Sequence, residues 1–377
     1  MLYFFTLFKF LFQFISNLLI RYPLPKNLGY MWNYGFLCGV ALVMQVITGL
    51  FLAMFYVPHV EYAFYSVDHI MHDVTYGWLL RLLHLNGASF FFVFIYIHMF
   101  RGLYYKSYHG ARLSTWFTGI TIYLLLMATA FLGYVLPWGQ MSYWAATVIT
   151  NFFTAIPIIG TDFLCWIWGG FSINNATLNR FFCLHYLLPF IIFVLVFFHL
   201  LMLHSTGSNG ELKVKNCINA NVKFYPFFII KDLFTVCLFG ILLVFMLFFY
   251  PEVLNHSLNY IPANPFVTPS QIVPEWYFLP FYAILRCIGH KTIGLLYMLF
   301  SIILLYFLPL LDTNNNRIII HNSLHKEDFW FFFFNFVFLG YLGMQPINDI
   351  SIIFSLLCTG LHFLFLLSPY LHTRLFF

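Results

Sequence analysis

Four histidines form two pairs with one spacing. His84 and His98 are fourteen positions apart in one apolar segment, and His185 and His199 have the same separation in another. On an α-helix, a step of this length advances about 21 Å and returns to almost the same face. Each helix would therefore carry two imidazoles on one stripe, one toward each side of a membrane whose apolar core is about 30 Å thick. Two such helices facing each other would form two bis-imidazole sites stacked across the bilayer.

Paired imidazoles inside a membrane point to haem iron. Two axial histidines saturate the iron and leave no open position for oxygen, which favours electron transfer. A single histidine in a membrane helix is often only a packed bundle residue, although an ionisable group in hydrocarbon is a functional candidate by default. Because two matched pairs favour ligation, the sequence predicts one haem between His84 and His185 and another between His98 and His199.

Glycines repeat the same period in two other apolar segments. Gly35 and Gly49 are separated by the same step as the histidines, and so are Gly119 and Gly133. A glycine lets a flat macrocycle approach the backbone closely, much as small residues let membrane helices approach each other. The alternative interpretation is that these glycines only pack helices together. The period that they share with the histidines argues against it.

Two arginines lie close in sequence to the histidines. Arg81 and Arg101 are each three residues from a histidine of the first pair, so each shares a helix face with that histidine. A guanidinium there could pair with a haem propionate. Arginines that only extend to the membrane interface are the alternative.

The composition is that of a membrane protein. The 377 residues are 62% hydrophobic and 8% charged, with a mean hydropathy of +0.87, far from the averages of soluble proteins. Seven cysteines lack any Cys-x-x-Cys spacing, so we expect inert thiols rather than a disulfide framework or a metal site. Apolar runs of spanning length occur at 32–56, 78–104, 113–134, 178–204, 227–248, 288–310, 328–346 and 350–371. We therefore predict an all-α membrane protein, a bundle of eight transmembrane helices with the haems between the second and fourth.

The distribution of basic residues predicts the orientation. With eight spans, thirteen Lys and Arg residues lie on the side of the two termini and four on the other side. The positive-inside rule then places both termini on the electrically negative side, which is the matrix or the cytoplasm. Residues 135–177 and 251–287, rich in Pro, Gly, Trp and Asn, are expected as surface helices and ordered loops on the positive side. No cleavable presequence is evident, which fits a bacterial protein or one made inside an organelle.

Two local strings carry a resemblance to a known family. Gly-Tyr-Val-Leu-Pro-Trp-Gly-Gln at 133–140 and Pro-Glu-Trp-Tyr at 274–277, together with the histidine pairs, resemble cytochrome b of the respiratory cytochrome bc complex, complex III. The similarity runs from about Trp32 to the C-terminus. We expect an N-terminal segment (1–31), a four-helix dihaem domain (32–210) and a C-terminal four-helix domain that carries the Pro-Glu-Trp-Tyr loop (211–377).

The resemblance implies an activity and its partners. It implies a quinol-oxidising and quinone-reducing subunit of ubiquinol–cytochrome c reductase with two b-type haems, in which transmembrane electron transfer is coupled to proton translocation (the Q cycle). The expected partners are a Rieske-type iron–sulfur protein, a c-type cytochrome, other complex III subunits, ubiquinone, membrane lipids and a second copy of the complex in a homodimer, with no nucleic acid. The expected location is the mitochondrial inner membrane rather than a bacterial plasma membrane.

The same resemblance implies two quinone sites. Tyr134, Pro274, Glu275 and Tyr277 match the quinol-oxidising site on the positive side, where Glu275 would accept a quinol proton; Phe131 and Ile149 are expected to line the pocket. On the negative side, His204, Lys231 and Asp232 match the quinone-reducing site and offer proton donors. There the family often has a small polar residue where this chain has Phe36, so we expect altered inhibitor contacts.

Other classes of membrane protein fit less well. A haem–copper oxidase needs adjacent histidines for copper, and no His-His dipeptide occurs. A secondary transporter would show inverted repeats with interrupted helices, and would not need histidines paired twice at one period. A purely structural membrane subunit would not need intramembrane histidines.

One departure from the family predicts altered inhibitor sensitivity. The family usually has glycine where this chain has Ala145, and the added methyl group should narrow the quinol pocket slightly. We expect turnover to persist while inhibitors of the methoxyacrylate type bind poorly. Titration of quinol oxidation with such an inhibitor, before and after Ala145→Gly, tests this. Full inhibition of the unaltered protein at low inhibitor, with no gain in potency on Ala145→Gly, would contradict it.

Overall fold

The computed structural model describes residues 6, 8–10, 12, 13, 16, 17, 20–208, 221–312 and 323–375. These residues are mostly helical, as predicted. The long helices are α2 (Tyr34–Ala53), α4 (Gly77–Tyr104), α5 (Leu113–Val135), α8 (Asn175–Thr206), α9 (Phe227–Phe249), α11 (Lys291–Leu311), α12 (Ser323–Met344) and α13 (Asp349–Leu375). The short ones are α3 (Ala63–His72), α6 (Gln140–Thr150), α7 (Gly160–Trp168) and α10 (Leu279–Arg286).

The membrane class is confirmed, and the predicted number of eight spans is approximately right. Among the described residues, seven helices are long and apolar enough to cross a membrane. The eighth long helix, α12, has 22 residues but carries Lys326, Glu327 and Asp328 near its start. The predicted boundary between two domains at 210/211 lies outside the described residues, and the division into three regions stays a prediction.

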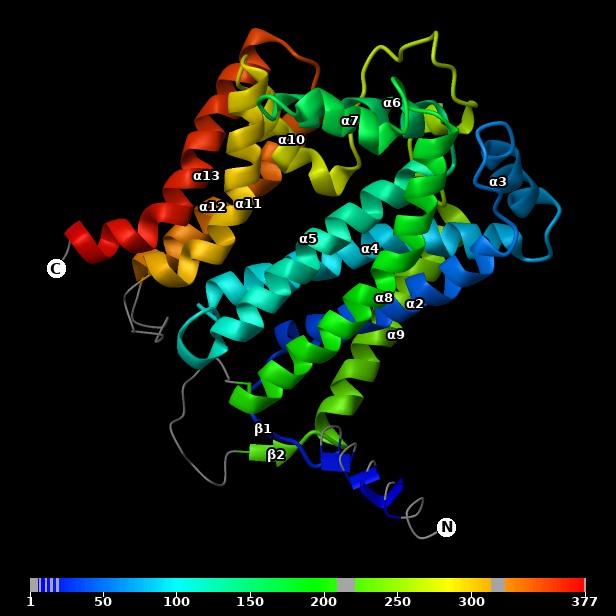
Figure 1. Cartoon of the computed structure of the whole chain (residues 1–377). Helices are drawn as coiled ribbons and strands as arrows, with labels where there is room; N and C mark the ends of the chain where they lie inside the picture. Colours follow the sequence, from blue (N-terminus) through cyan, green and yellow to red (C-terminus); the bar gives the residue numbers. More distant parts are fainter. Residues whose placement is uncertain are drawn as a thin grey trace.

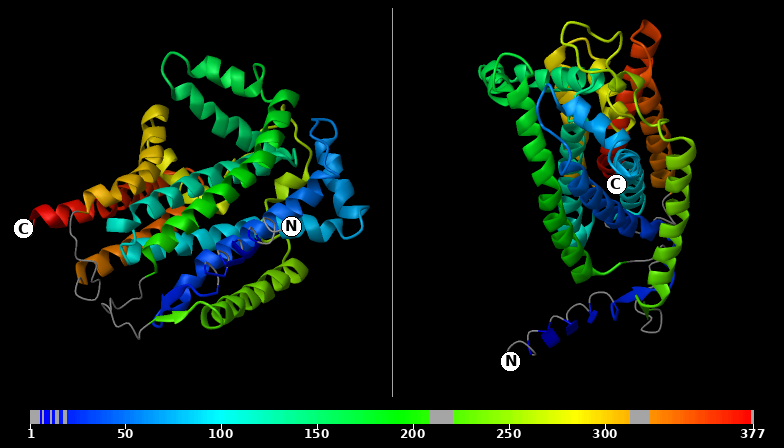
Figure 2. Two further views of the ribbon diagram at one scale, coloured as in Figure 1. Left: turned by 60° about the horizontal axis from the view of Figure 1, so that its bottom comes forward. Right: turned by 90° about the vertical axis from the view of Figure 1, so that its right-hand side faces the viewer.

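Two antiparallel helix pairs form the first half of the bundle. Helix α2 packs along α4, and α5 packs along α8. Helix α9 lies against α2 and α4 at the edge of this group (Figures 1 and 2). Helices α10, α11, α12 and α13 form a second group, joined to the first through contacts of α11 with α5 and of α12 with α4. A single large apolar cluster runs from Leu37 and Phe92 to Phe336 and Leu366 and connects the two groups.

The expected surface elements are present at the ends of the bundle. Helices α6 and α7 lie across one end, as predicted for residues 135–177 (Figure 1). The opposite end carries a two-stranded antiparallel sheet of β1 (Pro23–Pro25) and β2 (Asn221–Lys223). The other expected surface stretch contains short 3₁₀ turns η5 (Ser257–Tyr260) and η6 (Trp276–Phe278) and then α10.

Local sequence explains where α8 begins. The side chain of Asn174 accepts hydrogen bonds from the backbone N–H groups of Ala176 and Thr177, and the Thr177 hydroxyl accepts from the backbone N–H of Asn174. This reciprocal arrangement is a capping box, which satisfies N–H groups that have no partner at a helix start. It fixes the start of the helix that carries His185 and His199.

The loop between α9 and α10 is attached to α6. The backbone N–H of Gln140 donates to Ile261 O at 2.9 Å, and that of Ala263 donates to Trp138 O at 3.0 Å. The side-chain oxygen of Asn259 accepts from both the N–H and the hydroxyl of Ser142, at 2.9 Å each. The first part of this loop is therefore held at the end of the bundle where α5 turns into α6.

Candidate functional site

The four histidines come together in the two predicted pairs. Helices α4 and α8 place the ring centres of His84 and His185 6.2 Å apart, and those of His98 and His199 6.4 Å apart. When two imidazoles bind one metal ion, each nitrogen lies about 2 Å from the ion and each ring centre lies about 1 Å behind its nitrogen. The two ring centres are then roughly 6 Å apart. Both pairs thus have a spacing that would suit two ligands of one metal ion.

Each histidine faces one of the predicted glycines on the neighbouring antiparallel helix. A Cβ atom added at Gly49 would lie 3.1 Å from Cε1 of His84, and one at Gly35 would lie 3.2 Å from Cε1 of His98. On the other helix pair, Gly119 faces His199 and Gly133 faces His185 in the same way. Glycine therefore lets each imidazole lie against a helix backbone. The predicted role of these glycines in making room for the macrocycle stays a prediction.

Three of the four imidazoles have a threonine within hydrogen-bond distance of their Nδ1 atom, the outer nitrogen of the ring. The Thr48 hydroxyl lies 2.9 Å from Nδ1 of His84, and the Thr118 hydroxyl lies 3.1 Å from Nδ1 of His199. The Thr129 carbonyl lies 2.8 Å from Nδ1 of His185. Because a carbonyl only accepts, Nδ1 of His185 carries the proton and Nε2 is free to bind metal.

These threonines were not among the residues predicted from the sequence, although two of them directly precede predicted glycines. A Thr-Gly dipeptide occurs at 48–49 and again at 118–119. In both, the glycine makes room for an imidazole and the preceding threonine orients one.

The two predicted arginines differ in their surroundings. The Arg101 guanidinium lies 3.2 Å from Nδ1 of His98 and 5.4 Å from the centre of the Trp32 ring. Its Nε is buried and has no hydrogen-bond partner among the described residues. A buried cation with an unused donor suits an anionic group such as a propionate. Arg81 instead donates to the Tyr260 hydroxyl at 3.0 Å, so its role toward a propionate stays a prediction.

One cavity of about 260 Å³ joins the first histidine pair to the predicted quinol site. Its lining includes His84, His185, Gly49, Gly133 and Arg81 together with Tyr134, Glu275 and Tyr277. Phe131, Pro274, Ala145 and Ile149 are not among its lining residues; Ala145 is buried in α6 and Phe131 packs on Phe181. The structure thus brings three of the predicted quinol-site residues together with the first histidine pair, and the roles of the other four stay predictions.

Glu275 has the properties of a proton acceptor. It directly precedes η6 and receives a hydrogen bond from the Tyr134 hydroxyl. Burial raises the pKa of its carboxyl to about 7, against the opposing effect of the Tyr134 hydrogen bond. A carboxyl group that titrates near neutral pH can both take up and release a proton during turnover.

Comparisons with known proteins agree with this geometry. The family described as Cytochrome b/b6/petB matches residues 19–207, and the family described as Cytochrome b(C-terminal)/b6/petD matches residues 262–363. The cytochrome b of Cyanidium caldarium is 52% identical over 93% of this chain and 91% of its own length. That of Rickettsia prowazekii (strain Madrid E) is 53% identical over 87% of this chain and 83% of its own. The chain belongs to the cytochrome b family.

A solved structure extends the similarity to three dimensions. A chain of a structure titled "Hyperthermophilic respiratory Complex III" superimposes with a TM-score of 0.90 at 32% identity, and the match covers 95% of both chains. As a member of the cytochrome b family, this chain is a multi-pass membrane protein that binds haem. The predicted family and fold are therefore confirmed.

The predicted quinone-reducing residues lie at the opposite end, near the β1–β2 sheet. The His204 ring packs on Tyr22 with 4.2 Å between ring centres, and its Nδ1 lies 2.7 Å from Leu200 O. Lys231 donates to Leu28 O, and Asp232 is buried in α9. Within the described residues no hydrogen bond joins His204 to Asp232, so their joint action on a quinone stays a prediction.

The contact between Gly133 and His185 predicts a selective loss of one haem. A Cβ at Gly133 would overlap the His185 ring, so Gly133→Ala should displace this ligand. We expect a reduced-minus-oxidised spectrum to lose the component bound by His84 and His185 and to keep the other. Gly39→Ala, on α2 where an added Cβ meets nothing within 4 Å, is the control. Two unaltered haem components in Gly133→Ala would contradict the assignment.

Proposed function

We propose that this chain carries electrons across the membrane between two b-type haems, one held by His84 and His185 and one by His98 and His199. It is the catalytic cytochrome b subunit of complex III, the ubiquinol–cytochrome c reductase. The observation that carries the proposal is that two histidine pairs lie on the same two helices, each pair with a spacing that would suit two ligands of one metal ion. When bound, the haems supply the one-electron redox chemistry.

Residues around three of the histidines fix the orientation of the rings. Thr48, Thr118 and the Thr129 carbonyl hold Nδ1 of His84, His199 and His185, which leaves Nε2 of these rings for a metal ion. Arg101 supplies positive charge for an anionic substituent beside His98. These groups explain how a low-dielectric interior can hold a charged cofactor at defined positions.

The cavity beside His84 and His185 is proposed to bind quinol. Its walls are mostly apolar, with Glu275 and Tyr134 as polar groups that can meet a quinol hydroxyl. Glu275 accepts the proton, and the hydrogen bond from Tyr134 holds its carboxylate in place beforehand. Because quinol must lose protons as it loses electrons, a nearby acceptor with a pKa of about 7 suits the reaction at physiological pH. His204, Lys231 and Asp232 are proposed to serve quinone reduction at the other end.

The assembly and orientation follow the same proposal. Of the two quinol electrons, we expect one to pass to the haems of this chain and the other to pass to a Rieske-type iron–sulfur protein and then to a c-type cytochrome. We expect other subunits to complete a homodimeric complex. Ubiquinone is the expected substrate. We place the chain in the mitochondrial inner membrane with both termini on the matrix side. The orientation rests on the excess of basic residues on that side; relatives occur in eukaryotes and in bacteria.

A redox spectrum of the purified complex tests the haem assignment. We expect two b-type components of unequal potential, and replacement of His98 or His199 should remove only the component of higher potential. The equivalent replacement of His84 or His185 is the matched control and should remove only the other component. Absence of any haem signal from the unaltered complex would refute the proposal.

The pKa of Glu275 predicts the pH dependence of quinol oxidation. A carboxyl group that titrates at about 7 is protonated below this pH and cannot accept a proton, so the rate should fall as the pH falls through about 7. Glu275→Gln should slow quinol oxidation at pH 8 by at least about tenfold and abolish this inflection. Measured rate–pH profiles check both effects, with the haem spectrum as the control for assembly. An unchanged inflection in Glu275→Gln would assign it to another group.

A further inference from the structure

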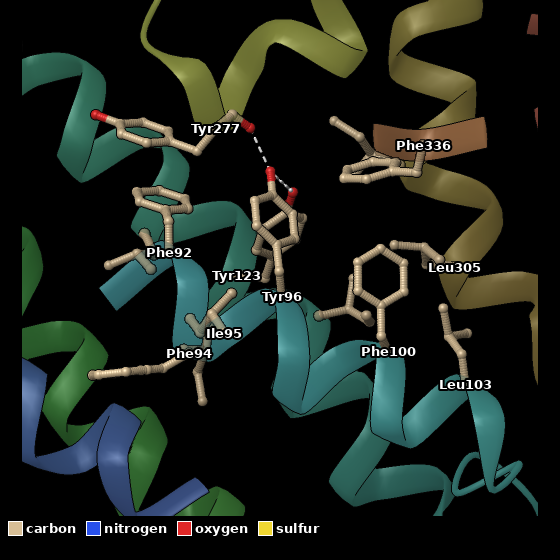
Figure 3. Close-up of a cluster of buried hydrophobic side chains, with 14 of the residues drawn as sticks. Phe92, Phe94, Ile95, Tyr96, Phe100, Leu103, Tyr123, Tyr277, Leu305 and Phe336 are labelled. Atoms are coloured by element: carbon tan, nitrogen blue, oxygen red, sulfur yellow. Dashed lines mark hydrogen bonds between the residues drawn. The ribbon is translucent and has the colours of Figure 1, made fainter. Parts of the chain in front are cut away.

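Helix α4 has a second face that contacts the Pro-Glu-Trp-Tyr segment. Ser89 accepts a hydrogen bond at 3.1 Å from Nε1 of Trp276. The Phe92 ring stacks on Tyr277, with ring centres 3.9 Å apart and planes inclined by 2°. The Tyr96 hydroxyl donates to the backbone carbonyl of Tyr277. Figure 3 shows Phe92 and Tyr96 on α4 pointing to the loop above them.

These three residues lie on a different side of α4 from the histidines. They are separated by three and four residues, which places them on one helix face. From the helical rotation of about 100° per residue, this face lies roughly 80–140° around the axis from His84. The same helix therefore holds haem ligands on one side and the quinol-site segment on another.

A second tyrosine orients the Tyr96 hydroxyl. The Tyr123 hydroxyl, on α5, donates to the oxygen of Tyr96 at 3.3 Å, and both side chains are buried among aromatic rings (Figure 3). A phenol has a single proton to donate, and a carbonyl can only accept. Since Tyr123 fills an acceptor position of Tyr96, the proton of Tyr96 is directed to the Tyr277 carbonyl.

The quinol-site segment depends on such external contacts. Residues 268–275 form no backbone–backbone hydrogen bond with each other in the described loop, and the Glu275 carbonyl bonds only forward, to Phe278 N at 2.8 Å. The earlier part of the loop is attached to α6 instead. The Gln271 amide donates to Met344 O on α12 at 3.1 Å, and the Tyr282 hydroxyl on α10 donates to Ile272 O at 3.3 Å. Closer to Glu275, the side chains of α4 bond Trp276 and the Tyr277 carbonyl.

We propose that Ser89, Phe92 and Tyr96 form a docking face that sets the position of Glu275 and Tyr277, with Tyr96 as a positioning residue for quinol oxidation. The inference rests on the proposed function of the cavity. Its physical basis is that α4 is one rigid element, so a segment bound to one face of it keeps a fixed distance from a ligand on another face. Ser89 and Phe92 also line the cavity, whereas neither Tyr96 nor Tyr123 is among its lining residues, so the two tyrosines act through the backbone that they hold.

Tyr96→Phe in the intact complex tests the proposal. It leaves the buried Tyr277 carbonyl without its donor, and we expect kcat/KM for quinol oxidation to fall by about fivefold. The loosened segment should admit water to Glu275, which moves the inflection of the pH profile below its unaltered position. Both haem components should remain, because the histidines lie on the other face.

Two further variants grade the effect. Tyr123→Phe leaves the bond from Tyr96 to the carbonyl in place and should cause a smaller fall. Tyr306→Phe is the matched control: it removes a hydroxyl that lies 2.9 Å from the Thr121 hydroxyl, in a contact between α11 and α5 away from the loop. It should behave like the unaltered complex.

The outcomes separate this inference from the proposed function. Equal rates and pH profiles for Tyr96→Phe and Tyr306→Phe would overturn the docking face while leaving the haem and quinol assignments intact. An unaltered complex without haem signals or quinol oxidation would instead overturn the proposed function. Should Tyr96→Phe fail to assemble, Tyr123→Phe decides, because Tyr123 does not line the cavity: a lowered kcat/KM with both haems present supports the docking face, and an unchanged value overturns it.

Discussion

The close approach of four imidazoles to the backbones of neighbouring helices is the constraint on which the rest of the structure depends. Helices α2 and α4 are antiparallel, so a step forward along one corresponds to an equal step back along the other, and each histidine meets a glycine. The same holds for α5 and α8. A register shift of a single position would bring a side chain against an imidazole. Helix register and ligand position are therefore fixed together within each pair of helices.

Buried charge occurs where several groups satisfy it. Away from the histidines, Asp312 at the end of α11 accepts from Lys106 at 2.8 Å, from His109 at 2.9 Å and from Tyr108 at 3.0 Å. Burial alone would raise the pKa of Asp312, but the hydrogen bonds and charges of His109 and Lys106 hold it well below its usual range. The cluster also holds Lys106 at a φ of 47°, a conformation unfavourable for a residue with a side chain. It joins the loop after α4 to the second group of helices.

Periodic features could be read from the sequence, and contacts between distant segments could not. The spans, the histidine pairs and the facing glycines follow from a helical period within one segment, and the Pro-Glu-Trp-Tyr string follows from resemblance. The contacts of Ser89, Phe92 and Tyr96 with the loop join segments far apart in the chain, and no period relates them. The lining of the cavity depends on the same loop path, which brings Glu275 to the Tyr134 hydroxyl.

Helix α4 shows why these two kinds of contact belong together. A site built on loops is positioned less accurately than one held by rigid elements, and the quinol-site segment is a loop with few backbone bonds of its own. Electron transfer needs a defined distance between donor and acceptor, whereas proton release needs Glu275 near water. Attaching the loop to the helix that bears His84 meets the first requirement through the backbone of Tyr277. The Glu275 side chain takes no part in that attachment, so it can meet the second.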